Sequence, residues 1–173
     1  LGSGAMNRAM ADFLALESAK EPFHHIHGVG EICWKSMQQW LSDDGVDLSA
    51  HPALEVREYI YDMAAVMRAA DLVICRAGAS TLSELTALGV PAILVPSPNV
   101  TNHHQKKNAA LLGDHGAALV LGEEGLDGKK LFAAAAGLLK DDARMAKMAD
   151  SMAQLGIRDA TERIYRTVMA LVK

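Results

Sequence analysis

The sequence predicts an α/β fold built on a doubly wound parallel sheet of the Rossmann-like kind. Short apolar runs alternate along the chain with segments whose apolar residues recur at helical spacing. Two of these runs, residues 72–75 and 92–95, are each followed by a loop that opens a helix pattern. Strand–loop–helix units in tandem build a nucleotide site at the carboxyl ends of their strands. The fold and the candidate site are therefore both predicted mainly from residues 71–108.

Composition supports a globular domain with a full core. Of the 173 residues, 50% are hydrophobic and 22% are charged, a balance that argues against disorder. The net charge of −4 supplies no basic field, so no nucleic-acid partner is expected. The sequence has no apolar stretch near the roughly 20 residues that span a bilayer, and its first residues lack a signal-peptide pattern. We expect a soluble, cytoplasmic protein with one domain over residues 1–173.

The first half of the chain is interpreted from apolar spacing and from helix breakers. Helical spacing alternates with short apolar stretches, and Pro22 ends the first helix pattern. An Asp-, Gly- and Ser-rich stretch indicates a surface loop, and the alternation of apolar and charged residues after it indicates a strand near a sheet edge. The predicted elements are helix 5–16, strand 23–26, helix 31–41, loop 42–52, strand 54–60 and helix 63–69.

The second half follows the same alternation, so its strands should be parallel with right-handed crossovers. Gly116 ends one helix pattern, and the terminal helix begins at Asp159 with an apolar stripe. That stripe consists of Ile164, Val168, Leu171 and Val172. The predicted elements are strands 72–75, 92–95 and 117–121, helices 105–115, 129–139 and 142–155, and the terminal helix.

The loop after the first central strand has the composition of a phosphate site. Gly78 and Ala79 keep it free of bulky side chains, so a ligand can approach the backbone. The following helix offers unpaired N–H groups, and Ser80 or Thr81 can cap it or donate a hydroxyl. Arg76 can bind phosphate or pair with a carboxylate. An ordinary capped strand-to-helix turn explains the same residues.

Glu84 lies one turn into that helix. A carboxylate there can accept hydrogen bonds from both hydroxyls of a ribose. It can equally form a capping box with Thr81, because the two residues stand three apart. Both interpretations remain open from the sequence.

A polar stretch over residues 101–108 follows the second central strand. Gln105 and Asn108 stand three apart and face the same side of the helix opening. Amides that donate and accept suit sugar hydroxyls. The adjacent His103 and His104 point apart with no third ligand nearby, so no metal is expected.

Other reactive side chains give weaker signals. His25 and His27 share one face of a strand, where a catalytic or a structural histidine is possible. No Ser-His-Asp order stands out. Cys33 and Cys75 are too few for a disulfide framework, and Cys75 should be a buried, reduced thiol.

Several stretches together resemble the carboxyl-terminal domain of the MurG family, GT-B glycosyltransferases that add N-acetylglucosamine to lipid I to give lipid II. The run from ADLVICRAGASTLSELTALGVPAILVPSP to TNHHQKKNAALL carries most of the resemblance. HHIHGVGE resembles the family's strand ending in H-x-x-G, REYIYDMAAVMRAAD its F-I-x-D-M-A segment, and GIRDATERI its terminal helix. The opening LGSGAMNRAM resembles the end of the GGS-x-G loop and the helix after it.

The resemblance implies a site for UDP-GlcNAc, a substrate, with no cofactor and no metal. The backbone of Ile60 would meet the uracil edge, and Glu84 would hold the ribose hydroxyls. Ala79 to Thr81 would line the diphosphate and sugar, and Gln105 and Asn108 would bind GlcNAc hydroxyls. The implied site residues are Ile60, Arg76, Gly78, Ala79, Ser80, Thr81, Leu82, Ser83, Glu84, His104, Gln105 and Asn108, with Gly2, Ser3 and Gly4 in the glycine-rich loop.

The sequence also departs from the family pattern. His104 stands where many relatives have Gln, and the family's phosphate-contacting Ser would fall just before Leu1. We therefore expect a fragment that lacks its first strand and the amino-terminal domain. That domain would carry the lipid I site, the base and the peripheral contact with the inner face of the bacterial membrane. No catalytic residue is expected in this chain, which alone should bind UDP-GlcNAc weakly and transfer nothing.

Two alternatives share the donor site. Relatives with the same domain transfer galactose or glucose from a UDP-sugar to diacylglycerol. Some eukaryotic GlcNAc transferases instead place the sugar-donor and membrane halves on two chains, so a stand-alone subunit with a membrane partner is also possible.

Overall fold

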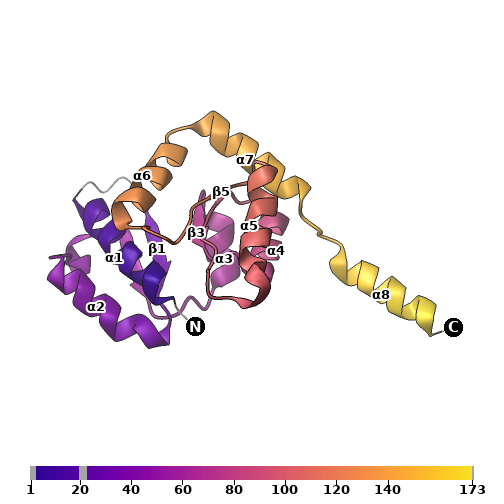
Figure 1. Ribbon diagram of the computed structural model, residues 1–173, viewed down its shortest axis with the longest axis horizontal. Helices are drawn as coiled ribbons and strands as arrows, with labels where there is room; N and C mark the ends of the chain where they lie inside the picture. The colour runs from indigo at the N-terminus through magenta and orange to yellow at the C-terminus, as the bar shows by residue number, and fades with distance from the viewer. Residues whose placement is uncertain (1–2, 20–22, 173) are drawn as a thin grey trace. The chain divides into compact units, whose positions relative to one another are not determined.

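The computed structural model describes residues 3–19 and 23–172 and divides into two compact units (Figure 1). The first unit comprises Leu1–Ala70 and Leu121–Asp142, and the second comprises Asp71–Val120 and Ala143–Lys173. In both units every strand pair is parallel, with helices between successive strands. The predicted α/β class with parallel strands is confirmed. The predicted single sheet is found as a two-stranded and a three-stranded sheet.

The first unit packs its helices around the pair β1–β2, in which His25 lies opposite Leu54. Its apolar core joins α1, α2 and the strand ends through Leu14, Val29 and Met37, each 0% exposed. Strand β1 begins two residues later than predicted. The elements are α1 (Gly4–Ser18), β1 (His25–Gly28), α2 (Trp34–Asp43), β2 (Leu54–Arg57), α3 (Met63–Ala69) and α6 (Gly128–Leu139).

Two short 3₁₀ turns refine the prediction for this unit. The helix predicted over residues 31–41 opens as the turn Glu31–Cys33 before α2 begins. The predicted surface loop contains the turn Leu48–Ala50, where the Asp47 carboxylate accepts a hydrogen bond from the Ser49 N–H at 2.9 Å. Asp at this N-cap position satisfies a helical N–H that periodicity cannot reveal.

Helices α1 and α6 lie side by side, joined by close backbone contact and by aromatic rings (Figure 1). A Cβ atom at Gly128 would lie 2.4 Å from the Phe13 backbone nitrogen and 2.4 Å from the Asp12 Cβ. The Phe13 ring meets the Phe132 ring edge-on, with the centroids 5.3 Å apart. The absence of a side chain at Gly128 is therefore what allows the two helices to approach.

The second unit is organised around the sheet β3-β4-β5, whose central strand β4 is completely buried. Gly89 ends α4 in the left-handed conformation, φ +74°, and packs against Ala153 of α7. Gly156 lies against the Thr86 carbonyl, which a Cβ atom would approach to 2.4 Å. The elements are β3 (Val73–Cys75), α4 (Ala79–Leu88), β4 (Ala92–Leu94), α5 (His104–Asp114), β5 (Ala118–Val120), α7 (Asp142–Gln154) and α8 (Ala160–Leu171).

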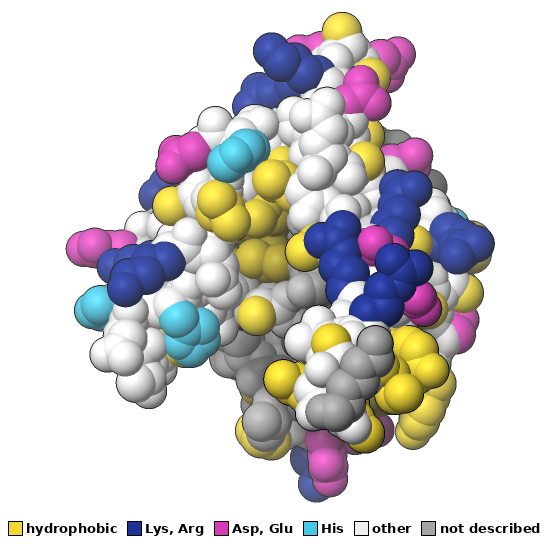
Figure 2. Space-filling view, turned by 90° about the vertical axis from the view of Figure 1, so that its right-hand side faces the viewer, with side chains coloured by type: hydrophobic (Ala, Val, Ile, Leu, Met, Phe, Trp, Pro, Cys, Tyr) yellow, Lys and Arg dark blue, Asp and Glu magenta, His cyan; other side chains and the backbone are white. Residues whose placement is uncertain are grey.

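The terminal helix α8 begins after Asp159, as predicted, and contains no buried residue. Its apolar stripe is present but exposed: Ile164 is 65% exposed and Leu171 is 81% exposed. Figure 2 shows hydrophobic and basic side chains interspersed on the face viewed from the right-hand side of Figure 1. Across residues 3–19 and 23–172, none of the helices combines the length and apolar character needed to cross a membrane.

Gly128 and Gly137 of α6 differ in the space around them, and this difference gives a stability prediction. Gly128→Ala should destabilise the chain by roughly 1–3 kcal/mol, because its methyl group would force α1 and α6 apart. Gly137→Ala is the matched control in the same helix, since a Cβ there meets nothing within 4 Å. The control should stabilise the chain by up to about 1 kcal/mol through helix propensity. Urea unfolding measures both changes, and equal effects of the two substitutions would contradict the packing argument.

Candidate functional site

The loop after β3 leads into a helix amino terminus that has no side-chain cap. Helix α4 begins at Ala79, and its N-cap Gly78 has an extended backbone, φ −73° and ψ 140°. The first helical hydrogen bond runs from the Leu82 N–H to the Gly78 carbonyl at 3.0 Å. Within the part of the chain that the structure describes, the N–H groups of residues 79–81 have no acceptor.

This start corrects the capping alternative raised from the sequence. Thr81 lies inside the helix rather than at its N-cap, so it forms no capping box with Glu84. Ser80 does not cap the helix either, because the chain becomes helical one residue earlier, at Ala79. Small side chains at Gly78 and Ala79 disguised the true start, since neither residue is a strong cap signal.

The side chains around this helix start divide into exposed and buried sets. Ala79, Ser80 and Glu84 are exposed, and Glu84 makes no hydrogen bond or ion pair with any residue in the described ranges. Leu82 is 6% exposed and packs in the core. The Ser83 hydroxyl donates to the Ala79 carbonyl at 2.9 Å. Of the residues in this turn, Leu82 and Ser83 thus have structural contacts, while Glu84 is available to a ligand.

Helix α5 is tied by two amide side chains to the carboxyl ends of both central strands. Asn108 Nδ2 donates to the Ala77 carbonyl at 3.1 Å, next to the N-cap of α4. The Ser97 N–H, just after β4, donates to Gln105 Oε1 at 2.9 Å. The predicted pair Gln105 and Asn108 therefore lies at the same sheet edge as the start of α4.

Arg76 joins the ends of the two strands directly. Its guanidinium donates to the Val95 carbonyl at 3.1 Å, and the side chain is half-buried. Of the two roles considered from the sequence, phosphate binding and pairing with a carboxylate, neither explains this bond. The bond gives Arg76 a structural task at the edge of the sheet where the loops gather.

The turn before α5 has a backbone that the sequence did not predict. Asn102 and His103 both adopt positive φ, 55° and 50°, which is uncommon outside glycine. The ring of His104 then lies against the turn, with Nδ1 2.9 Å from the Thr101 carbonyl. Because a carbonyl only accepts, Nδ1 carries the proton, and Nε2 of the neutral ring is an acceptor.

Ile60 and the glycine-rich loop belong to the first unit. The Ile60 side chain is 8% exposed, and a Cβ at Gly28 would lie 3.1 Å from its Cδ1. Its backbone N–H and C=O form no hydrogen bond with another described residue. Ser3 is the N-cap of α1, and its carbonyl accepts from the Asn7 N–H at 2.8 Å. Gly4 opens α1, and Gly2 lies outside the described residues.

His25 and His27 are half-buried and pair with the buried side chains of Glu17 and Asn7. His25 Nδ1 lies 2.8 Å from Glu17 Oε2, and His27 Nε2 lies 3.0 Å from Asn7 Oδ1. Asn7 Nδ2 in turn donates to the Val29 carbonyl at 2.9 Å. Burial, aided by the charge of a protonated His25, lowers the pKa of His27 to about 4. These contacts favour the structural interpretation of both histidines.

Cys75 also has a structural environment. Both cysteines are free thiols, and burial raises the pKa of the Cys75 thiol to about 12. A thiol with such a pKa is not a nucleophile at neutral pH. Cys75 in β3 is a free thiol, as predicted, but it is half-buried rather than fully buried.

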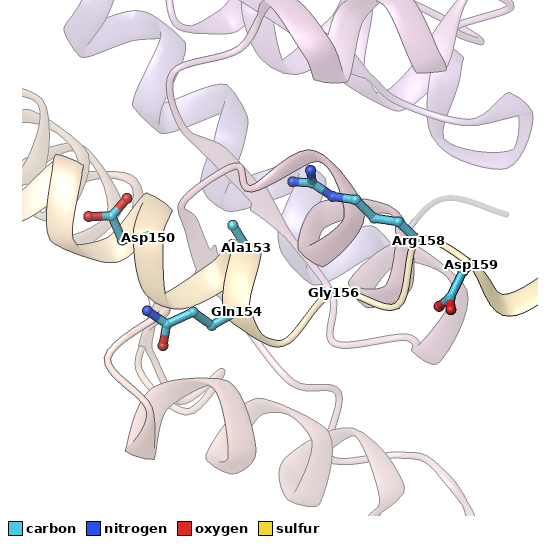
Figure 3. A pocket seen from close by; sticks show the side chains of 6 residues that line it. All are labelled: Asp150, Ala153, Gln154, Gly156, Arg158 and Asp159. Carbon is cyan, nitrogen blue, oxygen red and sulfur yellow. The ribbon is translucent and has the colours of Figure 1, made fainter.

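A separate hollow of about 590 Å³ lies where α7 meets the segment before α8 (Figure 3). It includes none of the predicted site residues. Figure 3 shows that its charged and amide side chains point in different directions rather than toward one centre. We therefore assign no ligand to it. Its lining residues are Asp150, Ala153, Gln154, Gly156, Arg158 and Asp159.

The chain matches a known family over nearly its whole length. The sequence pattern of the glycosyltransferase family 28 C-terminal domain matches residues 1–164. The chain belongs to this family. The resemblance to the MurG family found from the motifs is likewise confirmed.

Individual relatives of this family 28 domain agree with the assignment. A UDP-N-acetylglucosamine--N-acetylmuramyl-(pentapeptide) pyrophosphoryl-undecaprenol N-acetylglucosamine transferase from Acetivibrio thermocellus is 39% identical over 172 residues, covering 99% of this chain and 45% of the relative. Its namesake from Salinibacter ruber is 43% identical over 171 residues, with 99% and 44% coverage. The crystal structure of Acinetobacter baumannii MurG superposes with a TM-score of 0.80 at 28% identity, over 98% of this chain and 47% of that chain. The chain thus spans less than half of each relative.

Sequence reasoning missed the backbone groups that orient the site. The Ala77 carbonyl and the Ser97 N–H each follow a central strand and hold an amide of α5. Both groups lie just after the apolar runs, so the predicted ends of the two strands were the only sequence signal for their position. Which amide meets which strand end depends on tertiary packing, and spacing along the chain does not encode it.

The lowered pKa of the half-buried His27 predicts a loss of stability in acid. Its pKa is about 4 in the fold and 6.5 ordinarily, so the unfolded chain binds the proton more readily. Unfolding should therefore become easier as pH falls from about 6.5 to about 4, by roughly 3 kcal/mol in total, with no contribution above that window. His27→Gln keeps an N–H donor for Asn7 but cannot titrate, so its stability should fall less. Urea unfolding at about pH 7.5 and about pH 4.5 compares the two proteins, and equal acid losses would refute the assignment.

Proposed function

We propose that this chain binds UDP-GlcNAc as the sugar-donor half of an inverting glycosyltransferase. The observation that carries the proposal is the uncapped start of α4 beside two oriented amides of α5, at the carboxyl ends of β3 and β4. A nucleotide sugar has an anionic diphosphate next to a ring of hydroxyls. This edge of the sheet offers groups that complement both parts.

The diphosphate would bind at the start of α4. Three backbone N–H groups that have no acceptor among the described residues, together with the helix dipole, favour an anion at this end. Gly78 leaves space, since a Cβ there would meet nothing within 4 Å. The exposed hydroxyl of Ser80 lies in the same first turn and can donate to a phosphate oxygen. Thr81 adds a second hydroxyl.

The nucleoside and the sugar would occupy either side of the diphosphate. Glu84, exposed and one turn further along α4, would accept from the ribose hydroxyls. Gln105 and Asn108 would contact the GlcNAc hydroxyls from α5. The backbone N–H and C=O of Ile60, which form no hydrogen bond with another described residue, would pair with the donor and acceptor on the edge of uracil. This last contact is proposed from the family resemblance.

The whole protein would then have the activity that its relatives' name states, the transfer of GlcNAc to a muramyl-pentapeptide pyrophosphoryl-undecaprenol. The acceptor hydroxyl of this lipid would displace UDP at the anomeric carbon with inversion. This chain supplies groups that hold UDP-GlcNAc. Neither the base nor the lipid site is assigned to its residues, and the peripheral membrane contact is proposed for the remainder of the protein.

Isothermal titration of the chain with UDP-GlcNAc tests the proposal. Glu84→Ala should weaken binding about 10- to 100-fold, because it removes charge-assisted hydrogen bonds to the ribose. Asp114→Ala removes an exposed carboxylate at the opposite end of α5 and should leave the affinity unchanged. UDP-galactose and UDP-glucose serve as competing ligands. Tighter binding of UDP-galactose would favour the diacylglycerol glycosyltransferases instead, and equal affinities of the two variants would overturn the ribose assignment.

A further inference from the structure

Each of the two side-chain amides of α5 forms a hydrogen bond through only one of its two polar atoms. The atom used is the oxygen in one amide and the nitrogen in the other. Gln105 uses its oxygen, which accepts from the Ser97 N–H at 2.9 Å. Asn108 uses its nitrogen, which donates to the Ala77 carbonyl at 3.1 Å. Both side chains are half-buried and stand three residues apart on one helix.

The backbone partners fix which way each amide points. A backbone N–H can only donate, so the Gln105 oxygen must face Ser97. A carbonyl can only accept, so the Asn108 NH₂ group must face Ala77. Chemistry rather than atom labelling therefore settles both orientations, although amide oxygen and nitrogen are otherwise hard to tell apart.

What remains on each amide is therefore different. Gln105 has its NH₂ group left, which has no partner among the residues described. Asn108 has its oxygen left, likewise without a partner in the described ranges. A flip of either amide would place two donors or two acceptors against each other and leave the backbone group unpaired, so each amide keeps its observed orientation.

We propose that this wall of α5 has a fixed polarity that selects the sugar hydroxyls of the nucleotide sugar. Gln105 donates to a sugar oxygen, and Asn108 accepts from a sugar O–H. The backbone groups of Ser97 and Ala77 are positioning groups that set this polarity without touching the ligand. The assignment rests on the proposed function and adds to it the hydrogen-bond direction required at two positions of the sugar.

Fluorine and hydrogen substitutions of the sugar distinguish the two directions. Fluorine can accept a weak hydrogen bond but cannot donate, and hydrogen does neither. At the hydroxyl that meets Gln105, fluorine should be tolerated better than hydrogen. At the hydroxyl that meets Asn108, fluorine should bind worse than hydrogen, because it would face a carbonyl oxygen. The order of the two analogues should therefore reverse between two positions of one sugar.

Variants of this wall separate polarity from structural support. Gln105→Glu is nearly isosteric and can still accept from the Ser97 N–H, but it presents an oxygen to the ligand in place of NH₂. Ser97→Pro removes the N–H that orients Gln105, whereas Ser97→Ala retains it. Ser97→Ala is therefore the matched control for Ser97→Pro. If Ser97→Pro does not fold, Gln105→Glu still decides the question.

The experiment is calorimetric titration of the 173-residue chain with UDP-GlcNAc and with its deoxy and deoxyfluoro analogues at each free sugar hydroxyl. At one sugar position, the wild-type chain should bind the deoxyfluoro analogue several-fold tighter than the deoxy analogue. At another position, it should bind the deoxyfluoro analogue several-fold weaker. Gln105→Glu should reverse the first preference, Ser97→Pro should abolish it and Ser97→Ala should keep it.

Two outcomes overturn the proposal in distinguishable ways. The same order of fluorine and hydrogen at every position, or an unchanged order in Gln105→Glu, would refute the fixed polarity while UDP-GlcNAc binding stands. A wild-type chain that binds no UDP-GlcNAc would refute the proposed function, and the polarity assignment with it.

Discussion

The candidate site depends on three hydrogen bonds at the carboxyl ends of β3 and β4. Asn108 donates to the Ala77 carbonyl, Gln105 accepts from the Ser97 N–H, and Arg76 donates to the Val95 carbonyl. Each is worth only about 1 kcal/mol net. Together they fix two loops and one helix relative to the same sheet edge. Core packing of Leu85 and Ala109 places the two helices, and these bonds set how the polar groups at their first turns are oriented.

The open amino terminus of α4 follows from the choice of Gly78 as its N-cap. Ser, Thr, Asp or Asn at this position would accept a hydrogen bond from an N–H of the first turn and so occupy a group that an anion needs. Relative to those residues, glycine costs only a few tenths of a kcal/mol in helix stability. A glycine cap thus leaves the N–H groups free at little energetic cost. The same residue also keeps the approach clear of a side chain.

The sequence predicts the parts of the fold that depend on repeated patterns. Apolar runs and helical spacing identify β3, β4 and α5 to within a residue or two, because burial of one face imposes a period. The helix start at Ala79 was predicted late, since Ser80 and Thr81 look like caps while Gly78 does not. The positive φ angles at Asn102 and His103 carry no signal in spacing at all. These depend on how the turn is held by tertiary contacts.

In the candidate site too, some features follow from residue type and others depend on tertiary contacts. The residue types at Glu84, Gln105 and Asn108 suggest hydroxyl recognition, because carboxylates and amides suit such partners. Residue type does not show whether a side chain is free to contact a ligand. Glu84 is exposed and has no partner in the described part of the chain, while Leu82 in the same turn is buried. The orientation of the amides depends on backbone groups 8 and 31 residues away along the chain. Contacts at such separations emerge only once the sheet is formed.

The polar bonds around His27 in the first unit differ in kind from those that orient the two amides of α5, and this decides how each set responds to pH. In the first unit, the partly buried His25 and His27 pair with Glu17 and Asn7, and His27 must remain neutral. The bonds that orient Gln105 and Asn108 join amides to backbone groups, and neither partner titrates between acid and neutral pH. Protonation can therefore weaken the fold of the first unit without altering the polarity presented by α5. Acid sensitivity of the protein would accordingly originate in stability first, before any change in the hydrogen-bond directions offered to the sugar.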